Sequence, residues 1–164
     1  MRVEEVIMDA SPLIVLFRSH QIYILPQLFN TIWVPNAVWE EVTNEKYHDV
    51  AFDGLINAQW IQRVNVEQIP NRIKKRELGK GESEVLSFAL NSPNVYAVLD
   101  DLAARRCAKA LKIPILGTGG LFILAKQRGI ISSVTEALLS LRAVGLWLSE
   151  DVLEFLITKA GESK

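Results

Sequence analysis

The sequence predicts an α/β fold built on a mostly parallel sheet, and three observations support it. Short apolar runs that suit strands alternate along the chain with segments of helical spacing. The run at residues 95–99 is apolar throughout, which is typical of a strand buried on both faces of a parallel sheet. Acids stand where strands end or helices begin, at Asp9, Glu41, Glu82 and Asp100. Because the carboxyl ends of parallel strands face one crevice, we expect these acids to converge.

Five segments are expected to form strands, because each is apolar, β-branched or alternating and is closed by a turn or a helix-start signal. They cover residues 6–8, 31–34, 60–64, 95–99 and 113–116.

Helices are expected where apolar residues recur at helical spacing after a capping residue. They cover residues 13–17, 36–42, 82–90, 102–112, 121–128 and 137–144, and a last helix capped by Ser149, while residues 22–28 are short helical or irregular. In the helix over 102–112, the residues expected to be buried are Ala103, Ala104, Cys107, Ala108 and Leu111. Residues 44–58 offer only a turn signal at Asp53-Gly54. Residues 72–77 are expected to form a solvated basic loop, with an RNA-facing loop as the alternative.

Length and composition predict one domain over residues 1–164. The chain has 164 residues, close to the most frequent domain size of ~100 to 150. A hydrophobic content of 49% with 23% charged residues excludes a disordered chain. A net charge of -1 gives no general attraction to nucleic acid. An RNA partner would therefore have to be held by local basic groups or by metal.

The cellular location is expected to be the cytoplasm. Cys107 is the only cysteine, and no neighbouring His or Lys arrangement activates it, so it reads as a small buried thiol. The first residues carry Glu4 and Glu5 before the first apolar run, which is unlike a secretory signal. No apolar stretch approaches the ~18 residues of a membrane span, so we expect no membrane partner.

The segment Gly117-Thr-Gly-Gly120 precedes a helix, whose free backbone N–H groups could hold an anion such as phosphate. It lacks the Lys-Ser/Thr pair of a P-loop and the three-glycine spacing of a dinucleotide fold. As a nucleotide-binding signal it is weak.

The acids are informative as a group. A single carboxylate at a helix start is more often a cap than a ligand. Several carboxylates in one crevice repel each other, and a divalent cation, Mg²⁺ or Mn²⁺, relieves the repulsion. Such an ion supplies the chemistry of phosphodiester hydrolysis, because it polarises a phosphoryl oxygen and lowers the pKa of a bound water. The two histidines, His20 and His48, lie in poorly patterned segments and do not compete as catalytic groups.

The order of these motifs resembles a known family. It runs from Asp9 through Val-Pro-x-x-Val-x-x-Glu41, Gly-Glu82-Ser-Glu84 and Leu-Asp-Asp101 to Gly-Thr-Gly-Gly120. This order is similar to the PIN-domain superfamily, and most similar to prokaryotic PIN-like proteins that are related to the toxin nucleases of toxin–antitoxin pairs. The resemblance covers residues 6 to about 130. It implies a three-layer α/β/α sandwich, a Mg²⁺- or Mn²⁺-dependent ribonuclease, and RNA and a small antitoxin protein as partners.

Carried over residue by residue, the resemblance places the catalytic acids on Asp9, Glu82 and Asp100. The metal ligands would be Asp9, Glu41, Glu82 with Glu84 as the alternative, and Asp100 or Asp101. Candidate substrate contacts are Ser11, Arg105, Arg106 and Thr118. Two departures stand out: toxin nucleases often carry aspartate where this chain has Glu82, and threonine where it has Leu99.

Alternatives from other functional classes remain. The chain could be a degenerate PIN-like module that binds RNA or protein without cleaving, as Leu99 and the near-neutral charge suggest. A phospho-receiver also has paired aspartates at strand ends, but it needs a lysine where Gly117 stands.

The carboxyl-terminal third is expected to take part in assembly. Residues 131–164 form a helical extension packed on the core or at a dimer interface, with an apolar stripe at Leu153, Leu156 and Ile157. With four tryptophans, Trp33, Trp39, Trp60 and Trp147, this stripe predicts a homodimer.

Overall fold

The computed structural model describes residues 3–146 and 148–162. Within them one five-stranded sheet runs in the order β3-β2-β1-β4-β5, and every neighbouring pair is parallel. The strands are β1 (Glu5–Met8), β2 (Thr31–Pro35), β3 (Ile61–Val64), β4 (Val95–Val98) and β5 (Ile115–Leu116). All five expected strands are confirmed, with ends shifted by at most two residues.

Helices connect the strands and continue beyond the last one. They are α1 (Ala10–Arg18), α2 (Ile24–Leu28), α3 (Asn36–Val42), the 3₁₀ turn η1 (Glu45–Tyr47), α4 (Val50–Asn57), α5 (Asn71–Lys74), α6 (Lys80–Leu90), α7 (Leu102–Ala110), α8 (Thr118–Gln127), α9 (Val134–Ala143) and α10 (Glu150–Lys159). None of the helices in the described part of the chain is long and apolar enough to cross a membrane.

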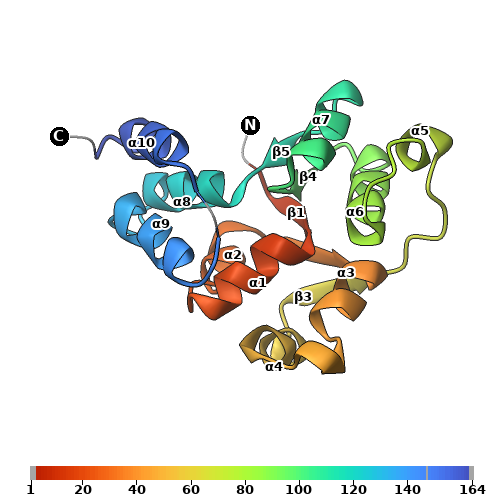
Figure 1. Cartoon of the computed structure of the whole chain (residues 1–164), viewed down its shortest axis with the longest axis horizontal. Helices are drawn as coiled ribbons and strands as arrows, with labels where there is room; N and C mark the ends of the chain where they lie inside the picture. Colours follow the sequence, from red (N-terminus) through yellow and green to blue (C-terminus); the bar gives the residue numbers. More distant parts are fainter. Residues whose placement is uncertain (1–2, 147, 163–164) are drawn as a thin grey trace.

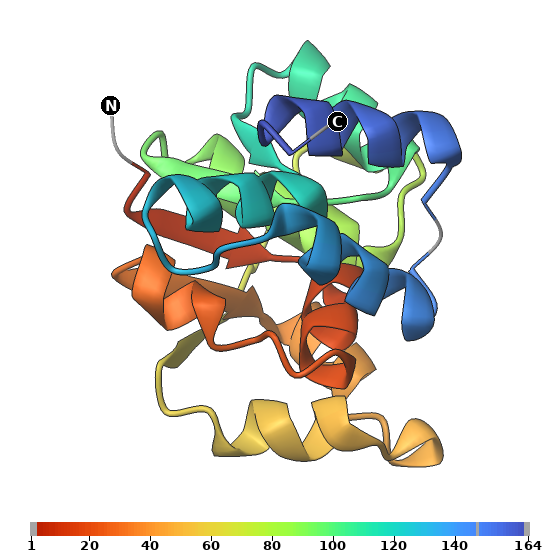
Figure 2. The same ribbon diagram turned by 90° about the vertical axis from the view of Figure 1, so that its left-hand side faces the viewer.

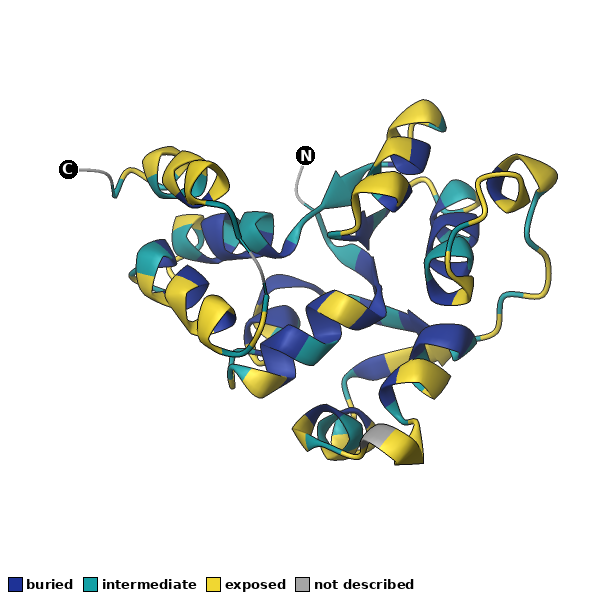
Figure 3. Ribbon diagram, in the orientation of Figure 1, coloured by how far each residue is buried: buried dark blue, intermediate teal, exposed yellow. Residues whose placement is uncertain are grey.

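The elements form three layers (Figure 1). Helix α6 packs on β1, β2 and β4 with α3, α5 and α7 on its side of the sheet, and α1, α2, α8, α9 and α10 lie on the other side. The core is continuous through the sheet and the helix faces that meet it (Figure 3). This arrangement confirms the α/β/α sandwich with a parallel sheet.

Three local expectations are corrected. The Asp53-Gly54 turn signal lies inside α4, where glycine is required for packing: a Cβ on Gly54 would lie 2.5 Å from the Phe17 ring of α1. The basic loop over 72–77 begins within α5, whose single buried residue is Ile73. Ala103 is exposed and not buried, because the apolar face of α7 is narrower than its sequence suggests.

The carboxyl-terminal helices pack on the molecule's own core. Helix α10 lies over α8 and α9 (Figure 2), and its stripe residues Leu153, Leu156 and Ile157 contact the core cluster. Within the described residues, the apolar stripe of α10 therefore packs on the molecule's own core. Because the stripe is already covered, it no longer supports a homodimer, and the homodimer stays a prediction. Trp147 lies outside the described residues.

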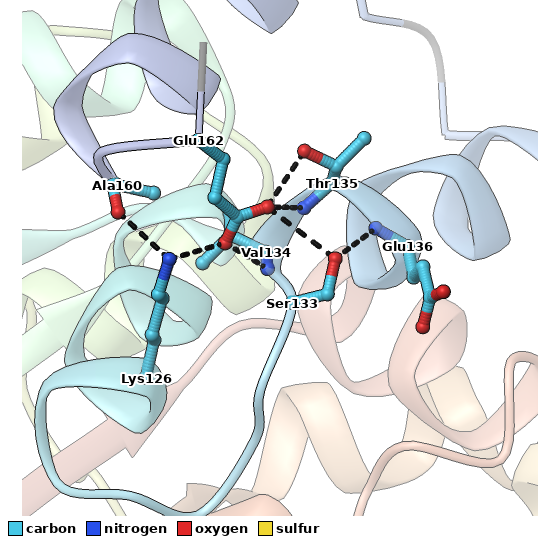
Figure 4. Close-up of polar contacts among 7 residues, drawn as sticks. All are labelled: Lys126, Ser133, Val134, Thr135, Glu136, Ala160 and Glu162. Atoms are coloured by element: carbon cyan, nitrogen blue, oxygen red, sulfur yellow. Dashed lines mark hydrogen bonds and ion pairs between the residues drawn. The ribbon is translucent and has the colours of Figure 1, made fainter. Parts of the chain in front are cut away.

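Glu162, which follows α10, is held by residues of α8 and α9 (Figure 4). Its carboxylate accepts hydrogen bonds from the backbone N–H of Val134 at 2.7 Å and of Thr135 at 2.9 Å, at the amino terminus of α9. Lys126 Nζ of α8 lies 2.8 Å away and also donates to the Ala160 carbonyl. One side chain thus ties α10 to α8 and α9.

Candidate active site

The site lies where the sheet changes direction. From β1 the chain moves outward to β2 and β3, and then crosses back to β4 on the other side of β1. In α/β sheets, ligands bind outside the carboxyl ends of the strands at such a switch point. Asp9 directly follows β1 and Asp100 follows β4 by two residues. The Asp9 backbone N–H donates to the Val98 carbonyl at 3.2 Å, so the two strand ends are held together.

Asp9 is a buried carboxylate among other acids. Asp9 is only 6% exposed, and its side chain makes no capping hydrogen bond to α1. Burial raises the pKa of Asp9 to about 7 from an ordinary value of 3.8, a backbone hydrogen bond from Ala10 opposes the rise, and the charges of Glu82, Glu41 and Asp100 add to it. The acids whose charges affect Asp9 thus come from α3, from α6 and from the segment after β4.

Gly81 marks the gap between two of these acids. A Cβ built on Gly81 would lie 3.6 Å from Asp9 Oδ1 and 3.7 Å from Glu41 Oε1, and 3.1 Å from Val38. The missing side chain leaves space between the two carboxylates. The sequence alone does not reveal this role of Gly81, because the role depends on the packing of α6 against α3 and the end of β1.

The third acid is Glu82, and its alternative has a structural role. Burial raises the pKa of Glu82, as do the charges of Asp101 and Glu41, while a backbone hydrogen bond from Gly79 lowers it. Glu84 is buried and accepts a hydrogen bond of 3.0 Å from the backbone N–H of Ala37 in the first turn of α3. Glu84 therefore joins α6 to α3, and Glu82 is the one of the two whose charge affects Asp9.

The last acid is Asp100, which is held by the start of α8. Its Oδ1 accepts from the Thr118 backbone N–H at 2.9 Å, and its Oδ2 accepts from the Thr118 hydroxyl. The anion at the glycine-rich helix start is thus the protein's own carboxylate. Thr118 is fully buried and positions Asp100, and its expected contact with substrate stays a prediction. Asp101 is exposed and caps α7 by accepting from Ala104 N–H at 2.9 Å.

The remaining expected substrate contacts lie at the rim. Arg105 donates to the Leu99 carbonyl at 2.8 Å, and its guanidinium lies beside Gly117 together with Asp100. Arg106 and Ser11 are exposed. Ser11 and Glu41 line a hollow of about 250 Å³ on one side of the acids, and Asp100 and Arg105 line a groove of about 510 Å³ on the other. A third hollow, of about 560 Å³ between α1 and α4, is away from the acids.

The expected closed set of Asp9, Glu82 and Asp100 is not formed. Within residues 3–146 and 148–162, no three Asp, Glu, His or Cys side chains are arranged to hold one metal ion. Competing hydrogen bonds explain this, because Asp100 is bound to Thr118 and Glu82 reaches back to the Gly79 N–H at 3.3 Å. The donor chemistry still fits a hard cation, since all the groups are carboxylates and the Gly81 gap separates two of them.

Comparison with known proteins agrees with this geometry. A family model described as PIN domain matches residues 5–162. The match extends past residue 130, so the carboxyl-terminal helices lie within the family's span. A search among curated proteins gives no match. The family match covers most of the chain, and the protein therefore belongs to the PIN-domain family.

Proposed function

We propose that this PIN-domain protein is a Mg²⁺- or Mn²⁺-dependent endoribonuclease that hydrolyses phosphodiester bonds of RNA. The observation that carries the proposal is Asp9, a buried carboxylate at the switch point whose charged neighbours are acids. An unpaired buried charge is costly, so its presence favours a functional role over a structural one. PIN domains are generally nucleases, which supports the same reading.

Each residue has a role in the proposal. Asp9 and Glu41, next to the Gly81 gap, would hold the ion, and Glu82 would join them if its carboxylate turned away from the Gly79 N–H. Asp100, fixed by Thr118, adds the fourth carboxylate of the site. The bound ion would polarise a phosphoryl oxygen and lower the pKa of an attacking water. Arg105, whose guanidinium donates to the Leu99 carbonyl beside Asp100, would contact a phosphate of the substrate.

The test is cleavage of a mixed RNA pool by purified protein with Mn²⁺ or Mg²⁺. We expect EDTA to stop cleavage and Asp9→Asn to reduce it by about 100-fold or more, because the variant removes the central ligand. Glu40→Gln is the matched control, because Glu40 is an exposed acid next to Glu41 on the same helix. This variant should cleave RNA as fast as the wild type does. No cleavage by the wild type with either ion, and no difference from Asp9→Asn, would exclude the enzyme.

A specific observation supports a second candidate, a degenerate module that binds RNA or protein without cleaving. Both Asp100 oxygens are engaged by Thr118, and Leu99 stands where toxin nucleases often carry threonine. This candidate predicts RNA binding that is independent of metal and unaffected by Asp9→Asn. The cleavage assay above, together with a binding assay in EDTA, separates the two.

The biological role that we propose is the toxin of a toxin–antitoxin pair, with a small antitoxin protein as partner. Expression in a bacterial host should slow growth, Asp9→Asn should abolish the effect, and a small protein encoded beside the gene should relieve it. Normal growth with active nuclease present would point to a housekeeping role. A homodimer is part of the proposal, and light scattering that gives 18.4 kDa at all micromolar concentrations would exclude it.

A further inference from the structure

A groove of about 510 Å³ begins at Asp100 and runs between α7, the start of α8 and α10. Leu102 of α7, Val152 and Phe155 of α10, and Gly117 before α8 are among the residues that line it. Because Asp100 belongs both to the acid cluster and to the groove, the groove is continuous with the candidate active site. Its volume is within the ~300 to 1,000 Å³ of sites that hold small organic groups.

The groove exposes apolar side chains that the fold does not need to expose. Phe155 is 63% exposed, Leu102 is 61% exposed and Val152 is 45% exposed. Helix α10 buries its opposite side, through Leu153, in the core. A contiguous exposed apolar surface beside a polar site indicates a binding surface.

Cations surround this apolar surface. Arg105 and Lys159 line the groove, and Lys159 Nζ lies 5.9 Å from the centroid of the Phe155 ring. Arg106 and Lys109 line the adjoining hollow on the other side of Leu102. Among the described acids of α10, Glu150 pairs with Arg142 at 3.1 Å and neither Asp151 nor Glu154 lines the groove. Asp100, a member of the acid cluster, also lines the groove, and the other charged groups of its lining, Arg105 and Lys159, are cations that complement phosphate.

We propose that this groove holds one nucleotide of single-stranded RNA next to the scissile phosphate. Its base stacks on Phe155, and Lys159 and Arg105 hold the phosphates on either side. An aromatic ring with flanking cations is how proteins hold single strands with little sequence preference, because every base offers a π-face. The inference rests on the proposed function, since it places the bound strand by reference to the cleavage site.

The first test measures binding of a fluorescent 12-nucleotide single-stranded RNA by anisotropy, in the Asp9→Asn background so that the RNA stays intact. Phe155→Leu keeps the apolar bulk and loses the stacking surface, so we expect Kd to rise about tenfold. Phe155→Trp should restore it. The matched control is Tyr23→Leu, an aromatic that is 68% exposed on another surface, and its Kd should change by less than about twofold.

The second test identifies the nucleotide and its phosphates. In a set of RNAs, each carries an abasic nucleotide at a different position. Binding should be weaker for the RNA whose abasic position lies next to the cleavage site, and binding by Phe155→Leu should not change with that replacement. Lys159→Ala should reduce the slope of log Kd against log salt concentration by about 0.7. This is the change expected when one phosphate contact on a single strand, and the counterion release that goes with it, is lost.

The outcomes separate this inference from the proposed function. If the wild type cleaves RNA but Phe155→Leu binds it as well as the parent, the groove assignment is wrong and the nuclease stands. If the wild type does not cleave but binding depends on Phe155, the groove stands without the nuclease. Unchanged RNA binding, with Phe155 needed for a protein partner instead, also overturns the assignment. Thermal unfolding of each variant checks that the exposed substitutions leave the fold intact.

Discussion

At the scale of one residue, Asp9 shows how a residue of a functional site can destabilise the folded protein. Burial and the charges of Glu82, Glu41 and Asp100 disfavour its ionised form, and its folded pKa is about 7 against 3.8 ordinarily. The folded state therefore loses stability as pH rises from about 4 through 7. Natural sites keep such a cost when function requires it.

We predict that Asp9→Asn, while removing cleavage, raises the free energy of unfolding at pH 8 by about 1 to 3 kcal/mol in EDTA, because it deletes the buried charge. The gain should vanish below about pH 4, where the wild-type group is protonated. Urea unfolding at several pH values measures both. Asp49→Asn is the opposite control, since Asp49 is bound by Arg18 at 2.7 Å and caps α4, and its loss should destabilise by about 1 kcal/mol. Equal signs for the two variants would contradict this account.

Gly81 gives a second prediction at this scale. Alanine in a helix is favoured over glycine by about 0.5 to 1 kcal/mol, and the close Val38 contact offsets that gain, so Gly81→Ala should change stability little. Its methyl group would fill the gap between Asp9 and Glu41, and Mn²⁺ affinity should fall about tenfold by calorimetry. Gly120→Ala, whose Cβ meets only Leu116 at 3.8 Å, should bind Mn²⁺ normally. Normal Mn²⁺ affinity in Gly81→Ala would move the ion away from this gap.

At the scale of helices and strands, the sequence predicts those elements that are determined by the pattern of neighbouring residues. All five strands and the helix over 36–42 were found, because alternation, apolar runs and capping residues act within a few positions. Helices α1 and α8 begin three residues earlier than predicted. The N-cap of α1 is Asp9, so the helix begins at Ala10, and the N-cap of α8 is Gly117, so that helix begins at Thr118.

Pairings between distant elements could not be predicted in this way. Thr118 holding Asp100, Glu84 joining α6 to α3 and the Gly81 gap each depend on which helices pack together. The sequence could list the acids of the site and place them on elements. It could not tell which were free and which were already hydrogen bonded.

Glu162 supplies a prediction for α10. A hydrogen bond from Lys126 lowers its pKa most, partial burial opposes this, and hydrogen bonds from Thr135 and Val134 lower it further, so the folded pKa lies well below the ordinary 4.5. Its stabilising effect is therefore complete above about pH 4.5 and is lost as pH falls. Glu162→Gln should lower the free energy of unfolding at pH 7 by about 2 kcal/mol and flatten the acid limb of the stability curve.

Denaturant unfolding from pH 3 to 8 measures this effect. Glu154→Gln is the matched control, because Glu154 is an exposed acid on the same helix and should leave stability within about 0.5 kcal/mol. A Glu162→Gln curve parallel to the wild type at all pH values would show that the carboxylate contributes no charge-dependent stability.

At the scale of the whole molecule, the carboxyl-terminal helices and the sheet form one body in which the binding groove depends on both. Helix α10 carries Phe155, while Asp100 follows β4, so the groove exists only if α10 stays docked. Docking rests on Leu153 in the core, on the Glu162 contacts and on Leu156, which packs so closely that a Cβ on Gly119 would lie 2.6 Å from it.

We therefore predict that the chain unfolds as a single domain in one transition. In a Trp147→Phe variant, fluorescence reports Trp33, Trp39 and Trp60, which all precede α5 in the sequence, whereas far-UV circular dichroism reports every helix, including α8, α9 and α10. Because one core cluster includes residues of β1, α8, α9 and α10, the two signals should give the same midpoint in urea. The same experiment in Glu162→Gln tests the coupling, since weaker docking should shift both midpoints together. An earlier circular dichroism transition of roughly a quarter of the helical signal, with fluorescence unchanged, would show instead that α9 and α10 unfold separately and that the groove opens before the fold is lost.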